Sequence, residues 1–462
     1  MLNRIFELFR LAGKHYCLTL TGILLLAALP RGMMLWHVSE EAYYHNDGTE
    51  YMDLARNLAQ GRGFSLSFYR WHEPEDPAFR KGVDVHTDLA RTPLLPLLGA
   101  LIHCLTEKVT LGAKIFSFVL SLFAVYCVWL LGKEIRGIAC GLWSSFLFAL
   151  YPYAIHYSGS FSTEDLFLVT LCLAFVFFLK ALHGKFSMLG FCGLFLALGS
   201  LTRPTAVVFV PLLCGALYVR VAVMGQENVL PVQNWKCSWK MPGKVWLHTG
   251  IFLLVFFLCM LPWTVRNRLA GGEWKMTTWY DGYVYFLSFS EIFVTTYQTL
   301  DTKEYTRKTD EAWKRVHAYY IGELHRKKIY DFPAVSRQWR QWGHEQLKRH
   351  PERIAYLLKE RFKHYWRMCP NLIVLTPLQI VLLRIFFSGL FLLALTGVYL
   401  FRRNYDTFIL LLPVFTGLLI SVVFLFVLRY RYPFFAPYVC VLSSLPLMEG
   451  ARFFQKSPKE VP

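Results

Sequence analysis

The chain has 462 residues, of which 55% are hydrophobic and 17% are charged, and its formal net charge is +18. Soluble globular domains have about 45–50% apolar and about 25% charged residues, so this composition excludes an ordinary soluble protein. The apolar residues stand in long uncharged blocks, which are typical of membrane-spanning helices. In a membrane protein, the positive charge indicates basic cytoplasmic loops and contact with membrane lipids, and no nucleic-acid partner is expected.

Ten apolar blocks predict ten spans. They cover residues 17–36, 111–132, 138–158, 163–182, 186–202, 204–220, 246–264, 379–401, 406–427 and 432–449. The first block follows three basic residues, as in a signal peptide, but no small-x-small pattern follows it, and we expect an uncleaved span. Residues 92–107 are apolar but short and contain Pro93 and Pro96, so they predict a re-entrant or interfacial helix.

The basic residues of the short loops orient the chain. With the N-terminus in the cytoplasm, every predicted cytoplasmic segment carries Lys or Arg, and ten spans return the C-terminus to the same side. We therefore expect a multi-pass membrane protein with an all-α, polytopic fold and both termini in the cytoplasm. Its predicted parts are an N-terminal membrane module at 1–264 with a first outer loop at 37–110, an extracytoplasmic helical region at 265–378, and a C-terminal membrane segment at 379–462.

The second outer region is strongly basic. Residues 303–367 contain 17 Lys and Arg against 8 Asp and Glu, together with Trp313, Trp339, Trp342 and Trp366. A basic, tryptophan-rich helical segment beside a membrane predicts an interfacial element that contacts lipid phosphates.

A candidate catalytic acid stands in the first outer loop. Asp47 begins a predicted amphipathic helix whose apolar face holds Tyr51, Leu54, Ala55 and Leu58. The spacing Asp47-x-x-Glu50 also fits a helix N-cap with a reciprocating Glu. The functional alternative is a carboxylate at the membrane edge that takes a proton from an attacking hydroxyl. The two interpretations are compatible.

A second acidic point, Glu164-Asp165, begins a span at its outer end. Capping and the helix dipole explain acids there. Alternatively, one of the two pairs with Asp47, around a divalent cation or to orient an acceptor. The sequence does not choose between Glu164 and Asp165. It also contains the cluster Asp84, His86 and Asp88, which could hold a metal ion but is better explained as an ordinary solvated loop.

Four arginines stand at predicted outer helix ends, where short loops are normally poor in arginine. They are Arg203, Arg266, Arg429 and Arg431. One explanation is snorkelling to lipid head groups. The other is recognition of a phosphate by forked, charge-assisted hydrogen bonds, which would also stabilise phosphate as a leaving group.

Five segments, in this order, carry a resemblance to a known family: residues 47–64, 91–96, 163–165, 201–204 with 262–267, and 429–433. The chain resembles the GT-C superfamily of polyprenyl-phosphate-sugar glycosyltransferases, and within it the bacterial relatives of protein O-mannosyltransferases and of the lipid A aminoarabinose transferase. The resemblance implies that Asp47 is the catalytic acid group and that the outer arginines contact the donor phosphate. Relatives often carry a second acid directly after the first, where this chain has Gly48, so Glu50 is a candidate substitute.

We therefore expect an inverting transfer of a sugar from a polyprenyl-phosphate carrier to the hydroxyl of a lipid, glycan or protein. Asp47 and Glu164 or Asp165 would be catalytic, and Glu50, Tyr51 and Arg91 would bind the acceptor or support the site. No cofactor is certain, and a divalent cation is left open. Two other classes remain: a transporter or flippase of lipid-linked glycans, and a non-catalytic assembly protein of the envelope.

Overall fold

The computed structural model describes residues 15–44, 47–68, 70, 86–222, 243–367, 375–424 and 428–453, which are almost entirely helical. Seven helices are long and apolar enough to cross a membrane. They are Tyr16–His37 (α2), Val109–Arg136 (α6), Thr163–Leu182 (α9), Pro204–Val221 (the 3-10 turn η2, Pro204–Val208, with α11, Phe209–Ala222), Val245–Gly271 (within α12, Gly243–Gly271), Pro377–Leu400 (α18) and Tyr405–Val423 (α19). Each coincides with a predicted span, so the protein is a multi-pass membrane protein.

The other three predicted spans differ from this pattern. The segment 138–158 divides into α7 (Ile138–Ala149) and α8 (Pro152–Tyr157), and 186–202 forms η1 (Phe186–Met188) and α10 (Leu189–Ser200). A helix of 12 residues extends about 18 Å, whereas the hydrocarbon core of a bilayer is about 30 Å thick. The third, 432–449, lies in α20 (Leu428–Phe453), a long and largely buried helix with three internal prolines. The number of crossings at these places stays a prediction.

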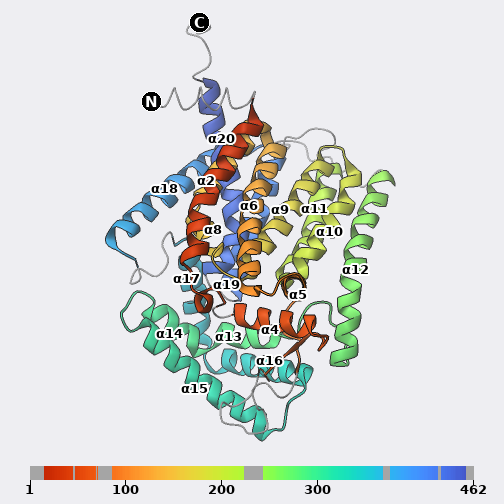
Figure 1. Ribbon diagram of the computed structural model, residues 1–462, viewed down its shortest axis with the longest axis vertical. Helices are drawn as coiled ribbons and strands as arrows, with labels where there is room; N and C mark the ends of the chain where they lie inside the picture. Colours follow the sequence, from red (N-terminus) through yellow and green to blue (C-terminus); the bar gives the residue numbers. More distant parts are fainter. Residues whose placement is uncertain are drawn as a thin grey trace, which may run out of the picture.

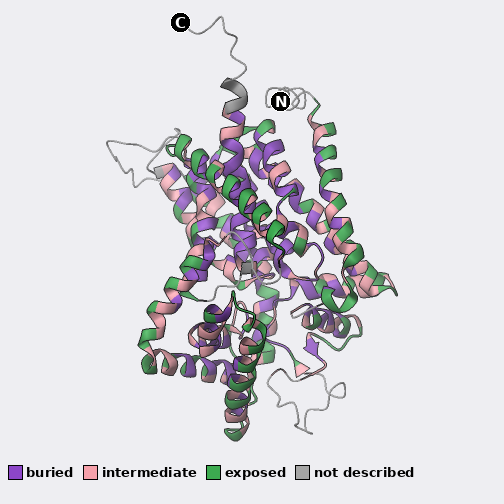
Figure 2. Cartoon of the chain, turned by 90° about the vertical axis from the view of Figure 1, so that its left-hand side faces the viewer, coloured by how far each residue is buried: buried purple, intermediate pink, exposed green. Residues whose placement is uncertain are grey.

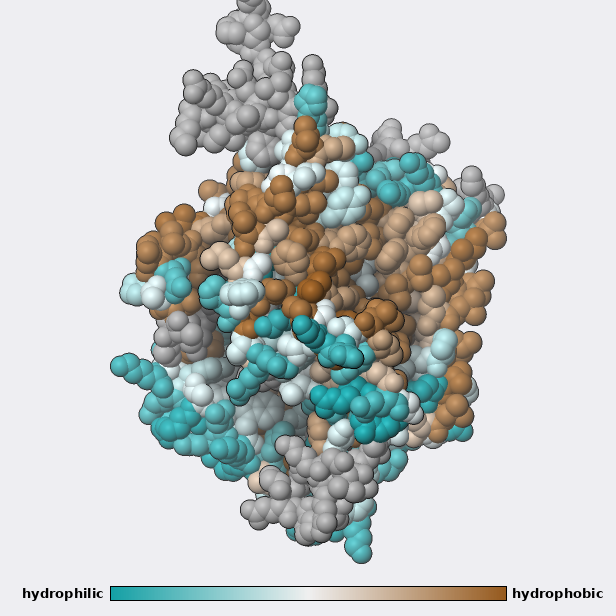
Figure 3. Space-filling model, in the orientation of Figure 1, coloured by the Kyte–Doolittle hydropathy of each residue, from teal (hydrophilic) through white to brown (hydrophobic). Residues whose placement is uncertain are grey.

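The long helices stand side by side, with the start of α2 and the end of α20 at one end of the bundle (Figure 1). The central helix α9 is apolar on all sides and lies buried among its neighbours, while the outer helices expose apolar side chains (Figure 2). The surface follows this division, because apolar side chains cover the bundle and polar ones gather toward the opposite end (Figure 3).

Both polar regions lie at that opposite end. The first contains α3 (Glu40–Tyr43), α4 (Asp47–Ala59), a two-stranded antiparallel sheet of β1 (Ser65–Leu66) and β2 (His86–Thr87), and α5 (Leu94–Leu105). Helix α4 packs against α5, and its predicted apolar face is buried or half-buried. Asn57, which falls on the predicted polar face, is also buried, because its Nδ2 donates to the Ser65 carbonyl at 2.7 Å.

The second polar region folds into five helices: α13 (Asp281–Phe289), α14 (Glu291–Thr299), α15 (Tyr305–Arg326), α16 (Phe332–Arg349) and α17 (Pro351–Tyr365). That this basic segment contacts lipid phosphates stays a prediction, but three of its tryptophans belong to the core of the region itself. Trp339 and Trp342 are buried in the hydrophobic core of this region, and Trp313 packs against it. The helices pack against one another, so these indoles contact other protein side chains. The domain boundaries stay a prediction.

Two buried arginines join this region to the bundle through backbone carbonyls. Arg361 of α17 donates to the carbonyls of Val422 and Val423, which end α19, and to that of Ser288. Arg431 of α20 donates to the carbonyls of Tyr365 and Arg367, which end α17. These contacts fix the outer helices on the ends of the spans.

At the other end of the bundle, His183 connects three helices. Its Nδ1 lies 3.1 Å from Glu134 Oε1 of α6, and its Nε2 lies 3.2 Å from Asp406 Oδ2 of α19. The hydrogen bonds from Asp406 and Glu134 raise the pKa of His183 from 6.5 to about 9, although burial opposes the rise. Because the folded-state pKa is the higher one, the stabilisation is complete below pH 6.5 and is lost as the pH rises through about 9.

We therefore expect His183→Gln to lower the midpoint of thermal unfolding at about pH 6 and to have little effect at about pH 10. Measuring both proteins in detergent at both pH values gives the difference. An equal loss for the variant at the two pH values would show that the charge of His183 contributes no stability.

Candidate functional site

Asp47, the first residue of α4, is held between two arginines from distant parts of the chain. Arg91 Nη2 donates to Asp47 Oδ1 at 2.6 Å, and Arg429 Nη2 donates to Asp47 Oδ2 at 2.6 Å. Arg91 stands just before α5, and Arg429 lies in the first turn of α20. Both carboxylate oxygens therefore accept a charge-assisted hydrogen bond, which is stronger than a bond between neutral groups.

Glu50, one turn further along α4, extends this arrangement. Its Oε2 accepts from Arg91 Nε at 2.6 Å and from Arg70 Nη1 at 2.7 Å. Arg70 Nη2 in turn donates to Asp88 Oδ1 at 2.9 Å, and Asp88 Oδ2 accepts from the backbone N–H of Arg91 at 2.8 Å. The charges alternate along this chain, and Asp88 fixes the backbone from which Arg91 reaches Asp47.

A second acid lies on the other side of Arg429. Glu164, in the first turn of α9, accepts from Arg203, whose Nε donates to Thr163 Oγ1 at 2.8 Å. Arg429 Nε lies 3.8 Å from Glu164 Oε1, so Arg429 stands between Asp47 and Glu164. Together Asp47, Glu50, Glu164, Arg91, Arg203, Arg429, Arg70 and Asp88 form what we call the charged cluster.

Backbone contacts bring the two halves of the charged cluster together. Thr92 Oγ1 donates to the carbonyl of Thr202 at 2.6 Å, and Leu94 N donates to that of Leu201 at 3.0 Å. The segment that carries Arg91 is thus attached to the turn that precedes Arg203. These bonds explain how residues more than a hundred positions apart share one site.

Aromatic rings support the guanidinium groups. Arg91 lies over the rings of Tyr51 and Tyr280, at 5.3 and 5.5 Å from their centroids. Arg203 lies 5.2 Å from the centroid of the Tyr430 ring. Such contacts favour the cationic form and restrict the arginine to one place.

The arginines determine the charge state of the acids on α4. Burial by itself raises the pKa of Asp47, but the charges and hydrogen bonds of Arg91 and Arg429 outweigh it and hold that pKa well below its usual range. Arg70 and Arg91 likewise lower the pKa of Glu50 against the effect of burial. Both carboxylates are therefore ionised at neutral pH.

A cavity of about 380 Å³ opens beside the charged cluster. Its polar wall includes Asp47, Tyr51, Arg91, Thr163, Arg203 and Tyr430. The facing wall is apolar and comes from the ends of spans and from α13 and α20: Val208, Val284, Ile420, Phe424 and Phe434. A cavity with a charged wall and an apolar wall, at the end of a helix bundle, suits an amphiphilic ligand.

The structure does not bring all predicted site residues here. The Asp165 carboxylate accepts from Tyr432 at 2.7 Å. Arg266 Nη2 donates to the carbonyl of Phe64 at 3.0 Å, and Arg431 donates to the backbone carbonyls that join α20 to α17. Of the two acids that the sequence left open, Glu164 is the one in the charged cluster.

Three members of the site were missed by the sequence analysis. Arg70 lies between two acids that are distant in sequence, and no local pattern marks it. Asp88 was considered as a metal ligand with His86 and Asp84, but it pairs with Arg70, and Asp84 lies outside the described residues. Tyr280, which supports Arg91, belongs to the second polar region, and its role depends on tertiary packing.

The charged cluster does not suit a divalent cation. Each of its four acids already pairs with a guanidinium group. A cation would need these carboxylate oxygens as ligands and would be repelled by the adjacent arginines. Among the described residues, no three His, Cys, Asp or Glu side chains are grouped to hold a metal ion.

Gly48 explains why no second acid follows Asp47. A Cβ atom at this position would lie 3.0 Å from the carbonyl oxygen of Phe161 and 3.6 Å from that of Tyr43. A carboxylate side chain would meet these oxygens, so the close packing of α4 against the Phe161 segment requires glycine. Glu50 supplies the second negative charge from one turn away.

We expect Arg70→Gln to destabilise the protein strongly. The Arg70 and Asp88 side chains are 6% and 0% exposed, so the variant leaves Asp88 and Glu50 short of their counter-charge. Breaking a buried ion pair costs about 3–5 kcal/mol. The exposed neighbour Arg62→Gln is the matched control, and its unfolding midpoint in detergent should hardly change. Similar midpoints for the two variants would show that the Arg70 pairs add no stability.

Residues 90–263 match the family described as dolichyl-phosphate-mannose-protein mannosyltransferase. No curated protein sequence matches the chain. The oligosaccharyltransferase of Archaeoglobus fulgidus is a structural neighbour in its apo form, with a TM-score of 0.55 and 14% identity over 93% of this chain and 50% of that one. A second structure of that enzyme, with an inhibitory peptide and a dolichol-phosphate, gives 0.54 and 15% over 96% and 52%.

ArnT from Cupriavidus metallidurans, bound to undecaprenyl phosphate, gives a TM-score of 0.41 and 12% identity over 98% of this chain and 82% of that one. The chain spans about half the length of the archaeal oligosaccharyltransferase. The family model thus matches part of the chain, and the shared arrangement of helices shows that its fold is like that of the archaeal oligosaccharyltransferase.

Proposed function

We propose that the chain transfers a sugar from a polyprenyl-phosphate carrier to an acceptor hydroxyl at the extracytoplasmic face of the bacterial plasma membrane. The observation that carries this proposal is Asp47, held between Arg91 and Arg429 in the wall of a cavity that also contains Arg203. The family match supports it. So do the relatives whose structures contain a dolichol-phosphate or an acceptor peptide.

The donor would use both walls of the 380 Å³ cavity. We assign its phosphate to Arg203, which lines the cavity, and to Arg429, which lies next to Asp47 and Glu164, since both can form forked hydrogen bonds. The apolar wall from the ends of η2–α11, α19 and α20 would take the first units of the prenyl chain. Arg266 and Arg431, which hold backbone carbonyls, would support the frame of the site instead.

The reaction would be a single displacement. The acceptor oxygen attacks the anomeric carbon, the bond from that carbon to the phosphate oxygen breaks, and its electron pair leaves with the phosphate. Asp47 accepts the proton of the acceptor hydroxyl, and the arginines stabilise the charge that develops on the leaving group. Attack from the side opposite the phosphate inverts the anomeric centre.

The two arginines on Asp47 also set its strength as a base. A carboxylate whose pKa is held low is a weak proton acceptor, because general-base catalysis is most effective when the pKa is near the working pH. A donor phosphate competing for Arg429 would leave one Asp47 oxygen for the acceptor and raise the Asp47 pKa. Arg91, held by Glu50, would keep the other oxygen in position.

Asp47→Asn tests this function. The amide keeps the size of the side chain but cannot take the proton, so transfer should fall by roughly 10²–10⁴-fold. The measurement is release of free polyprenyl phosphate from a labelled polyprenyl-phosphate sugar by purified protein with membrane extract. The control is Asp53→Asn, an acid of α4 outside the charged cluster, which accepts hydrogen bonds from Ser67. Near-normal turnover of Asp47→Asn would refute the proposal, and a transporter or an assembly protein would release no free carrier in any variant.

Arg203→Gln tests the assignment of the phosphate. We expect a rise in KM for the donor and a loss of kcat of roughly 10²–10³-fold, because the arginine would stabilise charge on the leaving group. Arg203→Lys should recover part of the activity, since the charge remains but the fork is lost. The exposed Arg268→Gln should behave as wild type. An unchanged donor KM and kcat for Arg203→Gln would remove Arg203 from the donor site.

A further inference from the structure

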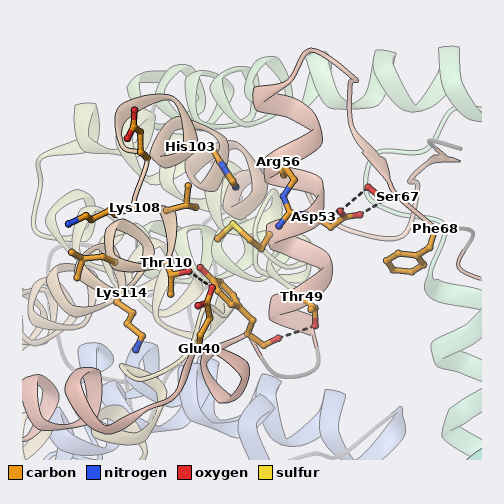
Figure 4. Close-up of a pocket in the computed structure, with 15 residues that line it drawn as sticks. Glu40, Thr49, Asp53, Arg56, Ser67, Phe68, His103, Lys108, Thr110 and Lys114 are labelled. Carbon is orange, nitrogen blue, oxygen red and sulfur yellow. Dashed lines mark hydrogen bonds and ion pairs between the residues drawn. The ribbon is translucent and has the colours of Figure 1, made fainter. Parts of the chain in front are cut away.

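A second cavity, of about 990 Å³, lies on the other side of α4 (Figure 4). Thr49, Met52, Asp53 and Arg56 of α4 line it, whereas Asp47 and Tyr51 line the first cavity. The remaining lining comes from α3 and the residue after it, the two residues after β1, the end of α5, the loop that follows it and the start of α6: Glu40, Tyr44, Ser67, Phe68, His103, Glu107, Lys108, Val109, Thr110, Leu111 and Lys114. Helix α4 therefore separates two cavities, and only one of them contains the charged cluster.

Three acids and three bases line this second cavity, but they are not equally engaged. Asp53 accepts hydrogen bonds from the backbone N–H and the hydroxyl of Ser67, at 2.7 and 2.9 Å. Glu40 accepts from Thr110 Oγ1 at 2.5 Å. Two of the three carboxylates therefore already accept hydrogen bonds from the protein. The third acid, Glu107, is exposed.

The bases keep more of their capacity. Arg56 reaches its nearest carboxylate, that of Asp53, only at 3.9 Å, and its side chain is 53% exposed. Lys108 is exposed at the N-cap of α6, and in the part of the chain that the structure describes its ammonium has no protein partner. Lys114 donates to the carbonyls of Val38 at 2.6 Å and Leu35 at 3.4 Å, which leaves one further N–H group. The side chains that can still donate hydrogen bonds to a ligand in this cavity are thus mainly cationic.

His103 adds a neutral donor. Its ring lies beside Arg56 in Figure 4, and its Nε2 is buried without a hydrogen-bond partner among the described residues. Burial, with the nearby charge of Arg56, lowers the pKa of His103, so the ring is neutral at pH 7. A neutral imidazole can present one N–H to an acceptor oxygen. Buried polar atoms are normally paired, so this nitrogen indicates a ligand with an acceptor group.

An exposed apolar stripe leads away from the cavity along α6. Leu111, which lines the cavity, is followed at intervals of four residues by Ile115, Val119 and Phe123, and these four side chains are 48%, 50%, 56% and 41% exposed. Residues spaced by four share one face of a helix. The stripe therefore runs from the mouth of a charged cavity down the surface of a membrane span.

We infer that this cavity binds a phospholipid, with the phosphate of its headgroup at Arg56 and His103, the charge of Lys108 across the same cavity, and an acyl chain along the α6 stripe. A charged cavity continuous with an apolar stripe at the end of a span matches an amphiphile of this shape. A free phosphate would use the cavity but not the stripe, and an uncharged glycolipid would use the stripe but not the bases. The site is separate from the proposed donor cavity and does not depend on the transfer reaction.

Lipid binding to the full chain, measured by native mass spectrometry in detergent, tests this inference. The probes are phosphatidylglycerol and monogalactosyldiacylglycerol with identical acyl chains, and soluble glycerol 3-phosphate. The test variant is Arg56→Gln/Lys108→Gln, and the matched control is Arg402→Gln/Arg403→Gln, which removes two exposed arginines after α18. All four positions are exposed, and equal unfolding midpoints without added lipid confirm that the variants fold.

We expect wild type to bind phosphatidylglycerol more tightly than the glycolipid. The test variant should lose about tenfold in phosphatidylglycerol affinity, because each basic residue near an anionic headgroup contributes to binding. Its glycolipid affinity, and both affinities of the control variant, should stay as in wild type. Unchanged phosphatidylglycerol binding by the test variant, an equal loss with the control, or glycerol 3-phosphate binding as tightly as the lipid would each overturn the inference.

Discussion

The pairing of carboxylates with guanidiniums in the charged cluster is the constraint on which the polar end of this protein depends. Removing a charge from water is costly unless an opposite charge and hydrogen bonds replace the lost hydration. Here the pairs run from Asp88 through Arg70, Glu50 and Arg91 to Asp47, and continue through Arg429, Glu164 and Arg203. They join α4, the segment before α5, α9, the turn after α10, and α20. None of these segments can shift without leaving a charge unpaired.

This arrangement follows from how the chain is divided. The spans satisfy their own backbone hydrogen bonds and bury apolar faces against neighbouring helices, so they need few polar side chains along their length. Polar residues are then free to collect at one set of helix ends. Arg361 and Arg431 fasten the five outer helices to those ends through backbone carbonyls, which brings Tyr280 over Arg91 and Arg70. The second polar region thereby completes a site whose other residues come from the helix ends and from the first polar region.

Hydropathy predicted most of the bundle because crossing a membrane imposes a long apolar helix, and that constraint is local in sequence. The start of α4 and the position of Asp47 were predictable for a similar reason, since amphipathic spacing is local. The split of 138–158 into two helices was less visible, because Pro152 breaks a segment whose composition is still apolar. Hydropathy alone does not register such a break.

The missed features share a different cause. Asn57 falls on the polar side of the α4 pattern, but the backbone of β1 passes over it and accepts its hydrogen bond. Trp339 and Trp342 belong to a segment whose composition is typical of an interfacial helix, but side chains of α13 and α15 cover both indoles. Arg70 has no pattern at all. In each case a segment distant in sequence decides the environment, so no window along the chain contains the information.

Under the proposed function, the same pairing would make the first cavity selective. Its guanidiniums are already shared with carboxylates, so an anion would be accepted only by an exchange of partners, and a phosphate that reaches Arg429 would compete with Asp47 for it. The exchange links two events that a glycosyl transfer needs together, the arrival of the phosphate and the release of a carboxylate oxygen. In such a site, the anion that takes Arg429 frees an oxygen of Asp47, and this oxygen is then available to act as the base. Arg91, with Glu50 behind it, keeps that carboxylate in place while its other partner changes.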